Sequence, residues 1–253
     1  MTQANEPGAL HWETLTWEEI AELKSQTTLT LLPVGATEQH GPHLGVGMDF
    51  YSAGILCDKV SSRTRVPVLP RVHYGCSLGH SKKWPGTLSL QPETLMNMIT
   101  EIYEWTHASG FNRMLLINGH VTNYAPLRCA LEKIRSTYND AMVGLYNVGE
   151  ISPRVRKVFY SDADDWHANR AETSYMLAKC PQLVRKNKLS EADDVDRTAG
   201  MVFAHSVNRT SSNGTTGTPS KATVEEGEKL FNWMVEDLCA LVMKAKDEQY
   251  PVA

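Results

Sequence analysis

The chain has 253 residues, of which 42% are hydrophobic and 21% are charged, and its formal net charge is −4. This composition is ordinary for a globular protein, and the length suits one large α/β domain. Lysine and arginine are scattered and form no basic helix face or zinc-finger pattern, which excludes nucleic acid as an expected partner. No apolar run approaches the roughly 18–20 residues of a membrane span, so no membrane partner is expected either.

The N-terminal stretch MTQANEPGALHWETLTWEE has neither a basic region nor an apolar core. This pattern argues against a signal peptide. The five cysteines are far apart and include no CxxC pair. They therefore predict neither a disulfide framework nor a thiolate-bound zinc, and we expect a cytoplasmic protein with reduced thiols.

Short apolar runs alternate with stretches of helical periodicity along the chain. In chain order, the expected elements are a buried strand at 29–34, a helix after Asp49, a second short apolar run at 66–70, a helix opened by Pro92 and stopped by Gly110, a strand at 113–117, a helix at 124–137, a strand at 141–148, and helices at 168–179 and 222–246. Continuous apolar strands that alternate with helices are typical of a parallel sheet covered on both faces. The polar segment 183–220 is expected to be an excursion or lid of this single domain.

Polar residues follow each of the first three apolar runs, in the stretches GATEQHGPH, PRVHYGCSLGH and NGHVTNY. Sites in open parallel sheets form beyond the carboxyl ends of the strands, so these loops are expected to converge. Glu38 and His40 are two positions apart, and in an extended segment their side chains point the same way. His120 follows the strand at 113–117. Asp49 lies just before an apolar helix, which it could instead cap.

Carboxylates and imidazoles that gather beside buried strand ends are costly unless a cation lies among them. Taken alone, Glu38 is explained by a solvated loop carboxylate, and His40 is explained by a structural imidazole. Their expected convergence favours a metal site instead. Mixed histidine and carboxylate ligands suit Zn²⁺, Mn²⁺ or Fe²⁺. The later stretch DDWHANRAETS adds His167 and Glu172. These two are about 140° apart on a helix, which favours separate tasks: Glu172 on the metal and His167 as a proton carrier.

Together these stretches resemble the motifs of the creatininase (creatinine amidohydrolase) family. The family loop E-x-H-G-x-H-L with a following aspartate matches Glu38, His40, Gly41, His43, Leu44 and Asp49. The later family motifs NGH-x-x-N, H-A-x-x-x-E-T-S, a Pro-Gly-Thr turn after an aromatic residue and G-x-x-G-x-P-x-x-A match residues 118–123, 167–174, 84–87 and 214–222. The resemblance spans about residues 28 to 245 in the family's order.

The resemblance implies a three-layer α/β/α fold with a mainly parallel central sheet over residues 1–253, and a homo-oligomer, commonly a hexamer. It also implies two divalent metal ions per subunit, zinc or manganese, with iron as a further option. One metal would be held by Glu38, Asp49 and His120, and the other by His40 and a bridging Asp49. Creatininase itself has a metal-binding glutamate where this chain has Thr122, so the missing carboxylate is assigned to Glu172. This departure argues against creatinine as the substrate.

The implied activity is hydrolysis of a C–N bond (amide, lactam or formamide) in a small polar, cyclic substrate by a metal-activated water, with His167 passing a proton to the leaving group. Five further residues are candidates for the pocket wall, although packing explains each equally well: Trp84, Trp166, His73, Tyr74 and His80.

Three other functions stay open from the sequence. The first is hydrolytic ring cleavage of a cyclic diketone, such as a dehydro-inosose in inositol catabolism. The second is a non-catalytic metabolite-binding α/β domain, although the stretch GVGMDF has only the first two glycines of a dinucleotide-binding motif. The third is a structural protein that depends on metal. Metal content separates the enzyme from a binding domain.

Overall fold

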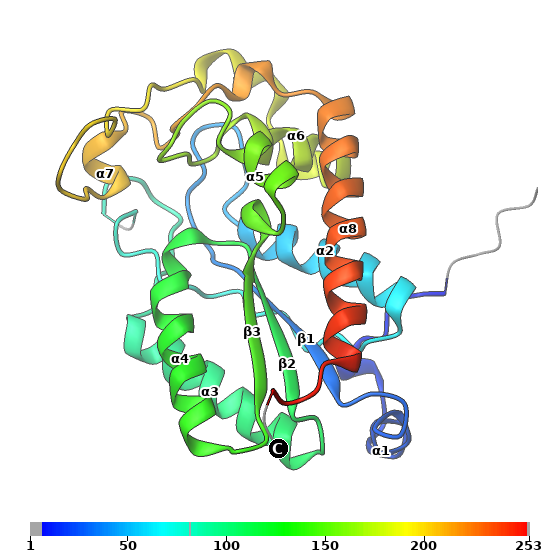
Figure 1. Cartoon of the computed structure of the whole chain (residues 1–253). Helices are drawn as coiled ribbons and strands as arrows, with labels where there is room; N and C mark the ends of the chain where they lie inside the picture. The colour runs from blue at the N-terminus through cyan, green and yellow to red at the C-terminus, as the bar shows by residue number, and fades with distance from the viewer. Residues whose placement is uncertain (1–6, 81, 252–253) are drawn as a thin grey trace, which may run out of the picture.

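A computed structural model of the chain describes residues 7–80 and 82–251; the first six residues of the N-terminal stretch lie outside them. At its centre is a parallel three-stranded sheet in the order β1-β2-β3, formed by Leu29–Val34, Arg113–Asn118 and Met142–Asn147 (Figure 1). Leu29 pairs with Arg113, and Arg113 pairs with Met142, so the three carboxyl ends are level. The three strands expected from the apolar runs are confirmed.

Eight α-helices accompany the sheet in the described residues: α1 (Trp17–Leu23), α2 (Met48–Thr64), α3 (Pro92–Ala108), α4 (Tyr124–Thr137), α5 (Pro153–Phe159), α6 (Arg170–Lys179), α7 (Val207–Thr210) and α8 (Val224–Asp247). The expected helices α2, α3, α4 and α8 are confirmed, with α4 at the predicted bounds. The short helices α1, α5 and α7 were not predicted, because they are too brief to show a clear apolar period. Among the described residues, no helix is both long and apolar enough to cross a membrane.

Each face of the sheet has its own hydrophobic core. Alternate strand residues face opposite sides: Leu31 and Ile117 pack in one cluster with α2, α6 and α8, whereas Leu32 and Leu116 pack in the other with α3 and α4. Figure 1 shows α2 and α8 on one side of the strands and α3 and α4 on the other. The fold is therefore the expected three-layer α/β/α arrangement.

The apolar run at 66–70 lies beside β1 but forms only isolated bridges. Val68 bridges to Leu31, and the Leu31 N–H donates to the Pro67 carbonyl at 2.9 Å. Proline has no N–H to give to a ladder, and this segment contains Pro67 and Pro70. The prolines therefore limit this edge to single contacts.

Helix α6 begins at Arg170, two residues later than expected. Asn169 caps it by accepting a hydrogen bond from the Glu172 N–H at 3.1 Å, and Ala168 has a positive φ of 50°. His167 is consequently outside the helix, where its backbone pairs with Thr216. Segment 183–220 consists of short turns and α7, and Figure 1 shows it at the end of the molecule to which the strands point.

Candidate metal centre

The loops beyond β1 and β2 and the first turn of α2 meet at the carboxyl end of the sheet. Two glycines make this approach possible: a Cβ on Gly35 would lie 2.3 Å from the Phe50 nitrogen, and one on Gly119 would lie 2.3 Å from the Asp49 carbonyl oxygen. Both distances are far below van der Waals contact. The glycines therefore let the first turn of α2 rest directly on the two strand ends.

Asp49 lies between two histidines in this first turn. Its Oδ1 is 3.1 Å from Nε2 of His40, and its Oδ2 is 3.3 Å from Nδ1 of His120. All three side chains are buried. The N-cap of α2 is Gly47, so the interpretation of Asp49 as a helix cap is wrong: its carboxylate points into the site.

Two further carboxylates complete two groups of metal-type ligands. Glu38 Oε2 is 2.7 Å from Nδ1 of His120, and Glu172 Oε1 is 4.0 Å from Nε2 of His40. The first group is Glu38, Asp49 and His120. The second group is His40, His167 and Glu172, and it adjoins the first through the contact of His40 with Asp49. The five residues assigned to metals from the sequence thus converge in one buried place.

The donor set fits divalent cations. Glu38 Oε1, Asp49 Oδ2 and Glu172 Oε2 are buried oxygens that accept no hydrogen bond within the described structure. Carboxylate oxygens that accept no hydrogen bond in a protein interior are costly, and a bound cation would satisfy them. Hard oxygen ligands combined with imidazole nitrogens suit zinc or manganese.

The pKa values of His40 and His120 indicate that the carboxylates of the site favour neighbouring positive charge. Burial alone would lower the pKa of His40, but the charges of Asp49, Glu172 and Glu38 raise it to about 10. Burial also opposes the charged form of His120, whose pKa Glu38 and Asp49 raise to about 9. Either protons on these imidazoles or metal cations would neutralise the carboxylates.

The two outer carboxylates differ in their own titration. Burial would raise the pKa of Glu38, but His120 and His80 lower it well below its usual range. Burial raises the pKa of Glu172 to about 7, assisted by Asp49 and Glu38 and opposed by His40. Of these two carboxylates, Glu172 is the one that neighbouring positive charge balances less.

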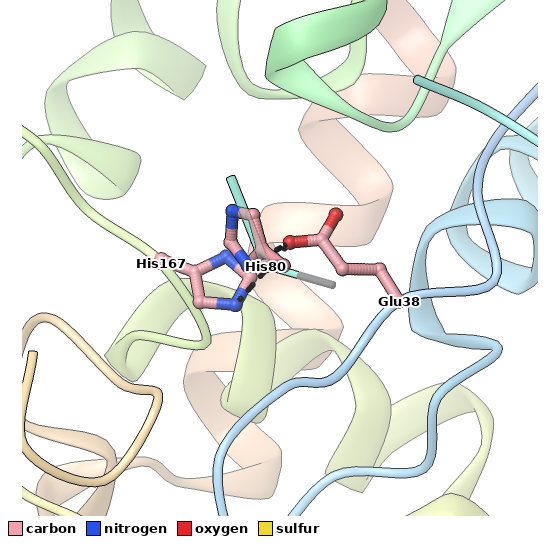
Figure 2. A group of neighbouring side chains, drawn as sticks. All are labelled: Glu38, His80 and His167. Atoms are coloured by element: carbon pink, nitrogen blue, oxygen red, sulfur yellow. Dashed lines mark ion pairs between the residues drawn. The ribbon is translucent and has the colours of Figure 1, made fainter. Parts of the chain in front are cut away.

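His167 and His80 form a third group with the remaining oxygen of Glu38 (Figure 2). His80 Nδ1 makes an ion-pair contact with Glu38 Oε1, and His167 Nε2 is 3.7 Å from the same atom. Burial, followed by the charges of His40 and His80, lowers the pKa of His167 well below its usual range. A neutral imidazole can accept a proton.

Gln39 was missed by the sequence reasoning although it lies between two predicted ligands. Its side-chain nitrogen is 3.1 Å from Nδ1 of His80 and 3.3 Å from Nε2 of His167, and it donates to the Gly214 carbonyl at 3.2 Å. Its backbone carbonyl is 3.0 Å from Nε2 of His167. This amide joins segments from three distant parts of the chain, so no local pattern could have revealed its role.

A cavity of about 380 Å³ opens onto the ligand groups. Two of the five predicted wall residues, His80 and Trp166, line it. Segment 183–220 also contributes to the wall, through residues such as His205 and Val207. Within the described structure this segment therefore borders the site.

The other three predicted wall residues do not line this cavity. His73 packs its ring 4.5 Å from that of Phe50, the Lys83 amine lies 4.7 Å above the ring of Trp84, and Tyr74 is 51% exposed. Their sequence neighbourhood suggested the site, but they come before and after the 76–80 stretch that reaches it.

His43 is buried beside the site but binds elsewhere. Its Nε2 is 2.8 Å from the Thr173 hydroxyl, and its Nδ1 has no hydrogen-bond partner in the described residues. Burial and the nearby charge of His40 lower its pKa to about 4. A neutral His43 that holds Thr173 braces the start of α6 against the ligand loop.

The fold and the ligand groups define a three-layer α/β protein with a histidine–carboxylate centre of the metal-dependent hydrolase type. The model of the creatininase family (creatinine amidohydrolase) matches residues 13–242. The chain belongs to the creatininase family, and it is accordingly an enzyme of the amidohydrolase class. The resemblance and fold predicted from the motifs are confirmed.

The chain is similar to several characterised family members over most of its length. It is 28% identical to the creatinine amidohydrolase of Pseudomonas putida over 253 residues, covering 94% of this chain and 96% of that protein. It is 32% identical to a mycofactocin precursor peptide peptidase of Mycolicibacterium smegmatis, covering 85% and 84%. A 3-dehydro-scyllo-inosose hydrolase of Thermotoga maritima is 25% identical, covering 71% and 59%.

Solved structures of creatininase have the same fold. A mutant creatininase of the Zn–Zn type superposes with a TM-score of 0.82 at 27% identity, covering 95% of this chain and 99% of that one. A manganese form of creatininase gives a TM-score of 0.81 at 27% identity, covering 95% and 100%. These relatives support binding of divalent metal by the family centre.

Proposed function

We propose that this protein is a metal-dependent hydrolase that cleaves a C–N bond of a small polar substrate, with two divalent ions, zinc or manganese, in each subunit. The observation that carries the proposal is the position of Asp49, whose two carboxylate oxygens face two different histidines. A carboxylate in that position is suited to bridge two cations. Glu38 and His120 would complete one ion's ligands, and His40 and Glu172 the other's.

Bound divalent ions would supply Lewis acidity, which activates water for hydrolysis and polarises a carbonyl group. The residues of the chain supply the remaining functions. The ligand side chains are almost fully buried, so they exclude bulk water from the floor of the cavity. Trp166 offers an aromatic wall for a planar substrate.

His167 is the proposed proton carrier. It lines the cavity, and its depressed pKa keeps the ring neutral at physiological pH. A neutral imidazole can take a proton from the nucleophile and deliver it to the leaving nitrogen. The 3.0 Å contact with the Gln39 carbonyl and the backbone pairing with Thr216 hold the ring at the edge of the ligand groups.

A substrate panel tests the proposal. The metal-loaded protein is incubated with creatinine, an N-formyl heterocycle, a short peptide and a cyclic diketone, and product formation is measured for each. Release of an amine or an opened lactam supports C–N hydrolysis. Turnover of the diketone alone would replace that reaction with C–C hydrolysis, which the similarity to an inosose hydrolase keeps in the panel.

Metal content tests the cofactor proposal separately. Near two divalent ions per chain are expected after loading and dialysis. A fully folded protein that retains no divalent ion would contradict the dinuclear centre, whatever the substrate proves to be.

We further propose that the protein is a cytoplasmic homo-oligomer, in keeping with the family resemblance. Val202 and Phe203, which are 91% and 78% exposed, lie within the segment 183–220 that borders the cavity. Large exposed apolar side chains of this kind are common at protein interfaces. Light scattering on the purified protein measures the assembly, and a monomer at micromolar concentration would contradict it.

A further inference from the structure

The two ring nitrogens of His120 have opposite surroundings. Nδ1 faces acidic oxygens, at 2.7 Å from Glu38 Oε2 and 3.3 Å from Asp49 Oδ2. Nε2 faces the Cys76 carbonyl at 3.1 Å, the Ser77 hydroxyl at 3.0 Å and the Thr122 hydroxyl at 2.5 Å. Either nitrogen of a neutral imidazole can carry the proton, and its hydrogen-bond partners decide which one does.

The Cys76 carbonyl can only accept, and the two hydroxyls near Nε2 each have another acceptor within reach. The Thr122 hydroxyl donates to the Cys76 carbonyl at 2.5 Å, and the Ser77 hydroxyl donates to Glu38 Oε2 at 3.2 Å. Each hydroxyl has one hydrogen, so once it is used the oxygen presents only lone pairs to His120. The third neighbour of Nε2, the Cys76 carbonyl, has no hydrogen to give. This arrangement favours the tautomer with the proton on Nε2.

We propose that Thr122, with Ser77 and the Cys76 carbonyl, fixes His120 as its Nε2–H tautomer, so that His120 would bind metal through Nδ1. Thr122 is thereby a positioning residue: it acts on the metal through His120. This inference rests on the proposed metal centre and deepens it. It also gives a task to the residue that stands where creatininase has a metal-binding glutamate.

The two ring nitrogens of His40 have the opposite arrangement to those of His120, so the inferred tautomer is specific to His120. There Nδ1 is 3.1 Å from the Glu38 carbonyl, and Nε2 faces Asp49. Each histidine thus has one nitrogen beside a backbone carbonyl and the other beside Asp49, with the roles of the nitrogens exchanged. Removing such a hydrogen-bond partner from a metal-binding imidazole typically weakens metal affinity by 10–100-fold.

Two measurements test the inference. A crystal structure of the zinc-loaded protein should place Nδ1 of His120 at about 2.0–2.1 Å from the ion, the usual zinc–imidazole distance. In competition titrations with a chelating dye, Thr122→Val should raise the zinc dissociation constant of the weakened site about 10–100-fold. Thr122→Ser keeps the hydroxyl and should bind zinc as the unchanged protein does.

The controls separate this inference from the proposed function. Thermal unfolding of the metal-free variants checks that they fold alike, and Ser77→Ala, which removes another acceptor of the Nε2–H, replaces Thr122→Val if that variant does not fold. Zinc bonded to Nε2, or equal zinc affinity in all variants, would overturn the tautomer assignment even if the enzyme hydrolyses amides. Zinc bonded to Nδ1 with the expected loss of affinity would support it even if no substrate of the panel is cleaved.

Discussion

His40 and His120 present opposite ring nitrogens to the two oxygens of one carboxylate: Nε2 of His40 lies 3.1 Å from Asp49 Oδ1, and Nδ1 of His120 lies 3.3 Å from Asp49 Oδ2. Because Asp49 is common to both sides, changing it is expected to affect both proposed metals, whereas changing Glu38 or Glu172 is expected to affect one.

Asp49→Asn should therefore reduce bound divalent metal from near two ions per chain toward zero. Turnover should fall by more than about 100-fold, the upper end of the cost of losing an outer partner of a ligand. Elemental analysis after dialysis and a rate measurement check both effects. Glu22→Gln, an exposed carboxylate on α1, is the matched control and should change neither. Full metal content in Asp49→Asn would rule out the bridging role.

His167→Ala should keep its metal and lose about 10²–10⁴-fold in kcat, which is the usual contribution of a general acid–base group. Metal content and kcat are measured on the same sample. His107→Ala controls for the loss of a histidine. The His107 imidazole pairs at 2.8 Å with Asp140, a residue distant in the sequence. Undiminished turnover in metal-loaded His167→Ala would show that another group carries the proton.

Removal of metal should lower the melting temperature, because buried oxygens of Glu38, Asp49 and Glu172 accept no hydrogen bond in the described structure. A ligand at 1,000 times its dissociation constant stabilises the folded state by about 4 kcal/mol. Thermal unfolding in a chelator, and again after zinc or manganese is restored, measures the difference. An identical melting temperature in both conditions would argue that the centre does not bind these ions.

The ion pair between Arg170 of α6 and Glu226 of α8 should make the free energy of unfolding depend on pH. Hydrogen bonds from Arg170 lower the pKa of Glu226, against the effect of burial, and Ser174 donates a further bond at 2.8 Å. Because the folded-state pKa is below the unfolded value of about 4.3, this stabilisation is present above that pH and is lost as the pH falls through the folded-state pKa.

Glu226→Gln should accordingly destabilise the protein by about 1 kcal/mol at neutral pH, a modest value because solvent screens the partly exposed Arg170. The difference between the two proteins should shrink in acid. Urea unfolding of both at neutral pH and at about pH 3, below the unfolded-state pKa, measures it. A difference that grows on acidification would have the wrong sign for this linkage.

Local patterns were sufficient to predict the elements that build the sheet and its covering helices. The run LTLLPV matches β1 and residues 124–137 match α4, because continuous apolar residues and a helical stripe leave little choice of structure. The run at 66–70 also predicted apolar backbone next to β1. Its prolines explain why it contributes bridges instead of a full strand.

The ligand loop was predictable for a different reason. The residues that follow parallel strands all lie at the edge of the sheet where the strands' carboxyl ends meet. The contributions of Ser77 and Gln39 were not, since each depends on a partner far away in the sequence. His73 and Tyr74 show the converse. They are near His80 in sequence, but a turn of the chain places them outside the cavity lining.

Gly35 and Gly119 set how closely Asp49 approaches the two strand ends. Neither glycine has a Cβ, which would hold α2 away from the sheet. A Cβ at either position would lie 2.3 Å from a backbone atom of Asp49 or Phe50. An alanine at either place would lift the Asp49 carboxylate relative to His40 and His120, which belong to the strand-end loops. The distances from Asp49 to these two histidines thus depend on two absent Cβ atoms, and the glycine of the Asn-Gly-His stretch matters because it has no side chain.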